Sequence, residues 1–265
     1  MIKRSDIDGG QGFDFGRTAA DYAKYRDIYP SSFYETLRRF EIGLPGQHIL
    51  DLGTGSGVIP RHMIQYGAKW TGADLSPEQI KMAKRLTTAH DLDIDYLVCP
   101  ADNVPVPDHI FDVVTACQCF WYFPLETTVP EIKRILKPGG TLAVISMIGL
   151  PRESEILAKS EQLVLKFNPL WNGGDFARVK LSPPDWLGED FSVVALHETV
   201  EDVPFTRENW RGRMRACRGV GAALPPPLIA QYDQEHDAAL RAMADETFCI
   251  PHQFLFQIFK ANAGL

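Results

Sequence analysis

Three alternating glycines, Gly53, Gly55 and Gly57, constrain the fold of this chain more than any other feature of its sequence. They directly follow the apolar run 48–52, which predicts a buried strand, and directly precede the run 58–66, which predicts a helix. Glycine lets the backbone pass close beneath a ligand in turn conformations that a Cβ atom would forbid. A strand followed by a glycine turn and a helix indicates the start of a βαβ unit. The glycine turn could be an ordinary turn or a ligand-binding turn.

Short apolar runs alternate with longer amphipathic runs from about residue 47 to residue 148. They predict strands at 48–52, 68–74, 94–98, 111–116 and 141–147, and helices at 58–66, 76–90 and 128–136. Elsewhere, strands are predicted at 191–199 and 253–260, and helices at 18–26, 31–40, 152–167, 206–218 and 227–247. The predicted fold class is α/β: a Rossmann-like, seven-stranded, mostly parallel sheet with helices on both faces, plus a helical cap.

The charge balance narrows the classes of partner. With 27 basic and 34 acidic residues the formal net charge is −7, so no nucleic-acid partner is expected. No apolar run reaches the roughly 18–20 residues of a membrane-spanning helix, and the first residues lack the apolar core of a signal peptide. The five cysteines form neither a disulfide framework nor a paired zinc pattern. We therefore expect no metal, no membrane partner and a cytoplasmic location.

An acidic residue, Asp74, closes the second predicted strand, 17 residues beyond Gly57. In an open α/β sheet this is the place where a carboxylate accepts hydrogen bonds from both hydroxyls of a bound ribose. Asp74 could instead cap the following helix, which begins after Ser76. The ribose role is the interpretation that the spacing favours.

Two classes of nucleotide fit a glycine turn with a ribose-binding acid. A dinucleotide fingerprint calls for a third glycine three positions after the second, where this chain has Val58. S-adenosylmethionine carries a positive sulfonium and an ammonium group. A nearby carboxylate such as Asp51 suits these positive charges better than it suits the negative pyrophosphate of a dinucleotide. The spacing therefore disfavours a nicotinamide-dependent oxidoreductase, which stays open as an alternative.

Five segments in order resemble the successive motifs of the class I S-adenosylmethionine-dependent methyltransferases, of the kind called methyltransferase type 11. They are residues 49–57, the strand end at Asp74, residues 100–103, residues 111–114 and residues 136–140. The opening stretch 15–30 is similar to the small-molecule branch that includes trans-aconitate methyltransferases. That branch often has Arg-Pro where this chain has Arg26-Asp27, so the N-terminal similarity is looser.

The resemblance implies S-adenosyl-L-methionine as the cofactor and assigns a role to each matching residue. Gly53 and Gly55 would lie under its methionine and ribose parts, and Asp74 would hold the ribose hydroxyls. Asp51, Gly57 and Leu75 would also belong to the cofactor-binding site. Asp102 would accept from the adenine amino group, the backbone of Asn103 would meet a ring nitrogen, and Gln118 would lie beside the methionine part. Tyr22 and Arg26 would fold over the cofactor. Three regions follow: N-terminal helices covering the cofactor (1–44), the cofactor-binding core (45–148), and the cap helices with the last two strands (149–265).

The methyl acceptor is expected to be a small molecule, because the Asn/Asp-Pro-Pro-aromatic motif of amino-methylating enzymes is absent after the fourth strand. Aromatic residues stand there instead, and Trp121 and Tyr122 would either wall an acceptor pocket or belong to the core. The predicted helix 206–218 carries a row of arginines that includes Arg211 and Arg215. These would either receive a carboxylate or another anion on the acceptor or form a solvated face.

We expect no catalytic base. Transfer to a carboxylate oxygen needs none, and no candidate residue stands out. The available candidates are Tyr22, Tyr25, Tyr122 and His252. The leading prediction is thus a small-molecule methyltransferase. Besides the oxidoreductase, a domain that binds S-adenosylmethionine without turnover remains an alternative, and the sequence leaves the acceptor and the oligomeric state open.

Overall fold

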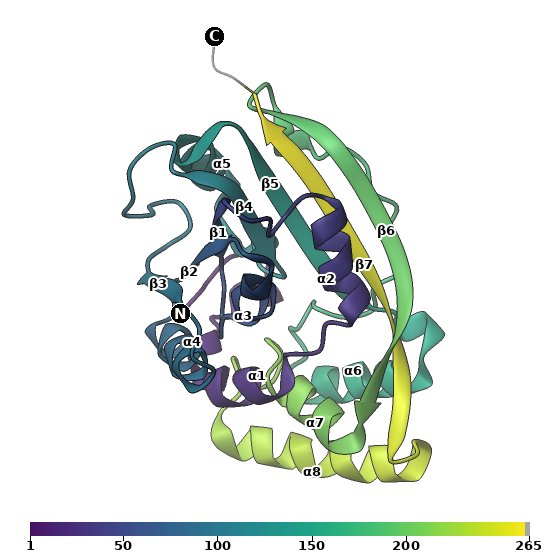
Figure 1. Cartoon of the computed structure of the whole chain (residues 1–265). Coiled ribbons are helices and arrows are strands. Elements are labelled where there is room, and N and C mark those ends of the chain that lie inside the picture. The colour runs from purple at the N-terminus through teal and green to yellow at the C-terminus, as the bar shows by residue number, and fades with distance from the viewer. Residues whose placement is uncertain (263–265) are drawn as a thin grey trace. The chain divides into compact units, whose positions relative to one another are not determined.

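The computed structural model describes residues 1–262 and contains a seven-stranded sheet in the order β3-β2-β1-β4-β5-β7-β6 (Figure 1). Its strands are β1 (His48–Leu52), β2 (Lys69–Asp74), β3 (Ile94–Val98), β4 (Phe111–Cys117), β5 (Leu136–Gly149), β6 (Phe191–Thr206) and β7 (Thr247–Ala261). The predicted fold class is confirmed, because the sheet is seven-stranded and the neighbouring pairs from β3 to β5 are all parallel.

β1 lies at the point where the strand order reverses. It pairs with β2 on one side and β4 on the other, so that Leu52, the last residue of β1, is aligned with Ala73 and with Ala116. The chain moves outward from β1 through β2 to β3, and then returns to the other side of β1 to form β4. Ligands of open α/β sheets bind beyond the carboxyl ends of the strands at such a switch point.

The last two strands run antiparallel to each other. The N–H of Asn262 donates to the carbonyl of Asp190 at one end, and the N–H of Arg207 donates to the carbonyl of Glu246 at the other. β6 continues to Thr206, beyond the predicted end at residue 199, and β7 begins at Thr247 instead of residue 253. The extension of β6 contains Pro204, and a proline without an N–H is tolerated on a strand at the edge of a sheet.

The helices follow the predicted pattern with small shifts at their ends. They are α1 (Ala19–Tyr25), α2 (Ser31–Arg39), α3 (Val58–Met63), α4 (Pro77–Ala89), α5 (Leu125–Ile135), α6 (Glu155–Phe167), α7 (Arg207–Arg215) and α8 (Pro226–Met243). α4 begins as predicted, with Ser76 accepting a hydrogen bond from the N–H of Gln79 and proline at the first position. α5 begins three residues earlier than predicted and contains Pro130. None of the helices in residues 1–262 is both long enough and apolar enough to cross a membrane.

The chain forms two compact units. Unit 1 consists of Met1–Ile28, Ile148–Val179 and Val200–Gln253, and unit 2 of Tyr29–Met147, Lys180–Thr199 and the stretch from Phe254 onward. α1 thus belongs to unit 1, whereas α2 belongs to unit 2. Unit 2 contains the glycine turn, and its core includes the buried faces of β1, β4 and α5.

Candidate functional site

The glycine turn leaves β1 in a conformation that favours glycine. Gly53, Gly55 and Gly57 have φ values of 63°, 55° and 75°, in the left-handed region that residues with a Cβ atom avoid. The turn is fixed by the N–H of Thr54, which donates to the carbonyl of Ala73 on β2 at 3.0 Å. Gly57 then serves as the N-cap of α3. The alternating glycines are therefore required by the backbone itself.

Two of these glycines also lie too close to their neighbours to carry a side chain. A Cβ atom on Gly53 would lie 2.7 Å from Sγ of Cys119, and one on Gly57 would lie 2.3 Å from Oη of Tyr96. Tyr96 is held in this place by a hydrogen bond of 2.9 Å between its hydroxyl and that of Thr87. Sequence reasoning missed Tyr96, because no spacing in the sequence connects β3 with this turn.

The carboxylate of Asp74 joins the glycine turn to the start of α4. Its Oδ2 accepts a hydrogen bond of 2.9 Å from the N–H of Gly55, and its Oδ1 accepts one of 2.8 Å from the N–H of Ser76. Burial raises the pKa of Asp74, while the two backbone hydrogen bonds oppose the increase. A carboxylate has about four lone-pair sites, so Asp74 can still accept from a diol. The neighbouring side chain of Leu75 is 53% exposed.

A second carboxylate, that of Asp51, is buried within β1. Its Oδ1 accepts a hydrogen bond of 2.6 Å from the hydroxyl of Thr115 on β4. Burial raises the pKa of Asp51 to about 6, although hydrogen bonding favours the ionised form. Asp51 is therefore mostly ionised at neutral pH, and a buried anion of this kind attracts a cationic ligand.

The end of β4 has an unusual backbone at Gln118. Its φ is 63°, a left-handed value that is uncommon for a residue other than glycine. The conformation is held by two hydrogen bonds to β5, from the backbone N–H to the carbonyl of Ile145 and from the side-chain amide to the carbonyl of Met147. Strain of this kind is concentrated at functional sites. The adjacent cysteines contact other groups: Cys117 donates to the hydroxyl of Tyr29, and Cys119 donates to the carbonyl of Leu52.

Asp102 and Asn103 lie in the loop that follows β3. Oδ2 of Asp102 accepts a hydrogen bond of 2.8 Å from the hydroxyl of Thr127 on α5. The N–H of Asn103 makes a long contact of 3.4 Å with the carbonyl of Pro100, and Asn103 is exposed. After β4, Trp121 is 42% exposed and its ring centroid lies 5.5 Å from that of Tyr122.

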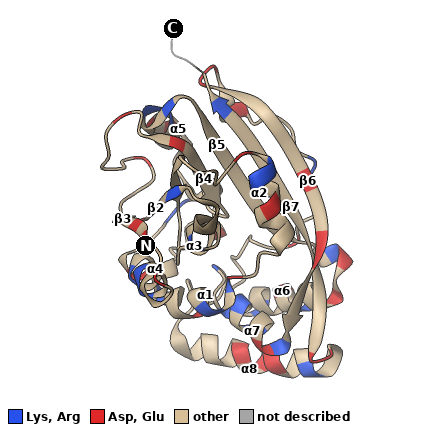
Figure 2. Ribbon diagram, in the orientation of Figure 1, with Lys and Arg blue, Asp and Glu red and all other residues tan. Residues whose placement is uncertain are grey.

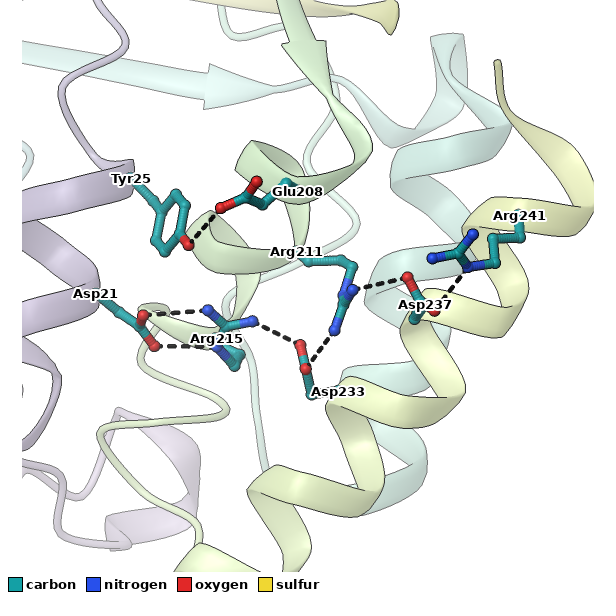
Figure 3. Close-up of polar contacts among 8 residues, drawn as sticks. All are labelled: Asp21, Tyr25, Glu208, Arg211, Arg215, Asp233, Asp237 and Arg241. Atoms are coloured by element: carbon teal, nitrogen blue, oxygen red, sulfur yellow. Dashed lines mark hydrogen bonds and ion pairs between the residues drawn. The ribbon is translucent and has the colours of Figure 1, made fainter. Parts of the chain in front are cut away.

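The other predicted site residues belong to unit 1. The guanidinium of Arg26 lies 5.2 Å from the ring centroid of Tyr22. Acidic residues of α8 lie beside basic residues of α7 (Figure 2), and Arg211 and Arg215 are both ion-paired there (Figure 3). Arg211 contacts Asp233 at 2.6 Å and Asp237 at 2.7 Å; Arg215 contacts Asp233 at 2.7 Å and Asp21 of α1 at 3.0 Å. The spacing of the arginines gave no indication of these carboxylate partners.

Unit 2 therefore brings together most of the residues that the sequence singled out. The three glycines, Asp51, Asp74 and Gln118 lie at or near the carboxyl ends of β1, β2 and β4, which the register of the sheet aligns. The site combines a glycine-rich turn, two buried or partly buried carboxylates and a strained strand end. This arrangement suits a ligand with a diol and a positive charge, as in S-adenosylmethionine.

Comparisons with known proteins show which domain and fold this chain resembles. Residues 50–144, from β1 to β5, match the family model described as a methyltransferase domain. The chain is 27% identical over 130 residues to a ubiquinone biosynthesis O-methyltransferase of Xanthomonas campestris pv. campestris, covering 48% of this chain and 54% of the relative. It is 35% identical over 109 residues to a demethylmenaquinone methyltransferase of Thermus thermophilus, covering 40% of this chain and 50% of the relative. The chain thus spans about half the length of the curated relatives that it matches.

Solved structures show the same fold at low sequence identity. A putative methyltransferase from Bacillus halodurans superposes with a TM-score of 0.56 at 18% identity, covering 88% of this chain and 100% of the other. A putative sarcosine dimethylglycine methyltransferase from Galdieria sulphuraria gives a TM-score of 0.53 at 17% identity, covering 87% and 84%. Residues 50–144 therefore match a methyltransferase domain, and the chain as a whole shares the fold of these solved structures.

Proposed function

We propose that the protein transfers a methyl group from S-adenosylmethionine to a small organic molecule. The observation that carries this proposal is the hydrogen bond from the N–H of Gly55 to Oδ2 of Asp74, which holds a diol-binding carboxylate against a glycine turn. The buried carboxylate of Asp51 adds a negative charge on β1, the strand that leads into this turn. Relatives named as a ubiquinone biosynthesis O-methyltransferase and a demethylmenaquinone methyltransferase support a small-molecule acceptor.

In this proposal each residue of unit 2 has a separate task. Asp74 accepts from the ribose hydroxyls, and Leu75 also contacts the cofactor. Asp102 accepts from the adenine amino group and the backbone of Asn103 meets the ring. Gln118 lies beside the methionine part, and Trp121 and Tyr122 wall the acceptor.

When bound, S-adenosylmethionine supplies an electrophilic methyl carbon, and the chain's residues orient the acceptor atom in line with it and exclude water. Asp74 and Gln118 would hold the cofactor, whose sulfonium would supply the methyl group for an in-line displacement by the acceptor's nucleophilic atom. An acceptor that reacts through a carboxylate oxygen has no proton to remove. The proposal therefore assigns no general base.

We further propose that the acceptor carries an anionic group. Arg211 supports this, because its Nε atom is buried and has no hydrogen-bond partner within residues 1–262. The two terminal nitrogens of this guanidinium are held by Asp233 and Asp237, so its orientation is fixed. A carboxylate oxygen is a suitable partner for the remaining N–H.

Binding and turnover test the main proposal. Isothermal titration calorimetry should detect binding of both S-adenosylmethionine and S-adenosylhomocysteine, and Asp74→Asn should weaken each by about 10- to 100-fold. Asp95→Asn is the matched control, because Asp95 is an exposed acid on β3 whose partner is Lys69. Methyl-tritiated cofactor should then label at least one member of a panel of small carboxylic acids and phenols. Folded protein that binds neither adenosyl ligand would disprove the proposal, and binding without labelling of any acceptor would favour a non-catalytic domain.

The anionic acceptor has a test of its own. For an acceptor found in that panel, Arg211→Gln should raise the acceptor KM more than the cofactor KM. Arg241→Gln removes an exposed partner of the same Asp237 and serves as the control. Equal changes in both KM values for Arg211→Gln would count against an anionic acceptor and leave the main proposal intact.

A further inference from the structure

One face of α5 holds the loop between β3 and β4, which carries Asp102 and Asn103. Thr127, Glu131 and Arg134 stand at positions i, i+4 and i+7 of α5, so their side chains lie along one side of the helix. All three form hydrogen bonds with this loop. We propose that this face, here called the α5 platform, positions the loop for selective recognition of an adenine base. The inference rests on the proposed function, because it concerns how the same cofactor is read.

Arg134 is the centre of the platform, since every N–H of its guanidinium has a partner. Its Nε and Nη2 donate to the two carboxylate oxygens of Glu131, each at 2.8 Å. The second hydrogen on Nη2 is directed to the carbonyl of Val104 at 3.1 Å. Nη1 donates to the carbonyl of Val106 at 3.0 Å and to Oδ1 of Asp108 at 2.6 Å. Five donors in a planar fork thus fix three loop residues at once.

Glu131 binds the same loop as a hydrogen-bond acceptor, whereas Arg134 binds it as a donor. Its Oε1 accepts a hydrogen bond of 2.7 Å from the N–H of Val104, whose carbonyl is bound by Arg134. The side chain of Glu131 is only 11% exposed. Its hydrogen bonds with Arg134 lower the pKa of Glu131, so the carboxylate is ionised at neutral pH. Both backbone polar groups of Val104 are therefore held by one ion pair.

Packing and a direct contact link the platform to the base-reading residues. The side chain of Val104 is buried in the core of unit 2 together with Val129 and Ile132 of α5, so the loop is anchored by apolar as well as polar groups. One helical turn before Glu131, the hydroxyl of Thr127 donates to Oδ2 of Asp102. This bond turns the carboxylate and leaves lone pairs for an exocyclic amino group.

A fixed carboxylate distinguishes bases by their hydrogen-bonding groups. Adenine presents an amino donor at its 6-position, whereas hypoxanthine presents a carbonyl acceptor there, and two acceptors facing each other are unfavourable. Discrimination of this type is large only where the polar group is held in place, because a mobile loop relaxes away from the mismatch. The platform therefore makes Arg134 a positioning residue for base selectivity.

The test compares two ligands that differ only in the base. Calorimetry of the full chain should show that S-adenosylhomocysteine binds at least tenfold more tightly than S-inosylhomocysteine. Arg134→Lys keeps the charge and loses the planar fork, and it should reduce this ratio at least fivefold. Thr127→Val removes one hydroxyl and should reduce the ratio in the same direction. The control is Lys133→Met, which removes an ion pair to Asp190 from the neighbouring position of α5 and should leave the ratio unchanged.

Hydrogen exchange of the ligand-free protein provides a readout independent of binding. Arg134→Lys should raise the exchange of the amide of Val104 at least tenfold, with little change for Lys133→Met. Unchanged exchange, or equal loss of affinity for both ligands, would overturn the positioning role and leave the proposed function standing. A wild-type protein that binds neither ligand would overturn the proposed function and the selectivity with it, while the exchange data would still report on the platform.

Discussion

The hydroxyl of Thr115 on β4 donates a hydrogen bond of 2.6 Å to the buried carboxylate of Asp51 on the neighbouring strand β1. Burial raises the pKa of Asp51 to about 6, and the bond from Thr115 opposes this increase. The two residues are aligned by the parallel register of β1 and β4. The pKa of Asp51 therefore lies close to the physiological range of pH.

This relationship predicts a pH dependence of cofactor affinity. If the ionised carboxylate attracts the sulfonium and ammonium groups, protonation of Asp51 must weaken binding. The Kd of S-adenosylmethionine should change little near pH 7 and should rise as the pH falls through 6, by up to about tenfold per pH unit. Thr115→Val removes a bond that favours the ionised form, so the midpoint should move to higher pH. Calorimetry between pH 5 and pH 8 measures both, and a flat profile for the wild type would contradict the role of Asp51.

A second prediction concerns the stability of the glycine turn. Gly57→Ala places a Cβ atom 2.3 Å from Oη of Tyr96 at a φ of 75°, so that strain and a steric clash act together. We expect a loss of about 3 kcal/mol in the free energy of unfolding. Gly139→Ala is the control, because Gly139 has a φ of 71° but no atom within 4 Å of an added Cβ, and it should lose only about 1 kcal/mol.

Tyr96→Phe identifies the source of the clash. In urea unfolding of the four proteins of a double-mutant cycle, Gly57→Ala should be less harmful in the Tyr96→Phe background, because the hydroxyl oxygen is the nearest atom. Additive losses would show that backbone strain alone accounts for the effect of Gly57→Ala.

The sequence could predict the parts of the site that depend on local spacing. The glycines precede a helix in a conformation that few other residues adopt, and Asp74 ends a strand at a regular distance, so both could be identified from residues near one another. The contacts of Tyr96 with Gly57 and of Thr115 with Asp51 join residues on separate strands. They depend on the register of the sheet, which a single sequence does not specify.

The arginines of α7 illustrate the same difference. Helical spacing placed Arg211 and Arg215 on adjacent turns of one helix, and the structure agrees. Their partners Asp233 and Asp237 lie on α8, and which faces of two helices meet is decided by tertiary packing. The α5 platform could have been noticed from the i, i+4, i+7 spacing of Thr127, Glu131 and Arg134, but its target loop could not.

A third prediction follows from the ion pairs of unit 1. Arg215 lies between Asp21 and Asp233, and all three side chains are partly buried (Figure 3). Burial alone would raise the pKa of Asp233, but hydrogen bonds from Arg211 and Arg215 lower it overall. Arg215→Met should therefore reduce the free energy of unfolding by about 2 kcal/mol at pH 7, less than for a fully buried pair because water screens the charges.

The pH dependence of this loss has a definite sign. A carboxyl group whose pKa is lowered by folding adds stability above its ordinary pKa of 3.8 and loses it as the pH falls through the lowered value. The difference between wild type and Arg215→Met should therefore shrink below pH 4 in urea unfolding. Arg241→Met, which removes an exposed pair with Asp237, should unfold like the wild type. Equal effects of the two substitutions would show that burial of Arg215 is unimportant.

A fourth prediction concerns the buried imidazole of His252. Its Nδ1 lies 2.8 Å from the carbonyl of Ile250, which can only accept, so Nδ1 carries the hydrogen. The lone pair of Nε2 then faces the guanidinium of Arg213 at 3.5 Å. Burial, followed by the charge of Arg213, lowers the pKa of His252 to about 3 from an ordinary value of 6.5. Folding therefore requires the neutral ring.

Because the unfolded chain binds this proton more readily, stability is fully present above pH 6.5 and falls as the pH decreases toward 3. His252→Gln removes the titrating group, so between pH 6 and pH 4 its free energy of unfolding should decline less steeply than that of the wild type. The expected difference in slope is about 1.4 kcal/mol per pH unit. Urea unfolding at several pH values measures it, with His90→Gln as the control because His90 is exposed at the end of α4. Parallel curves for wild type and His252→Gln would mean that His252 accepts a proton in the folded protein, which its contact with Arg213 opposes.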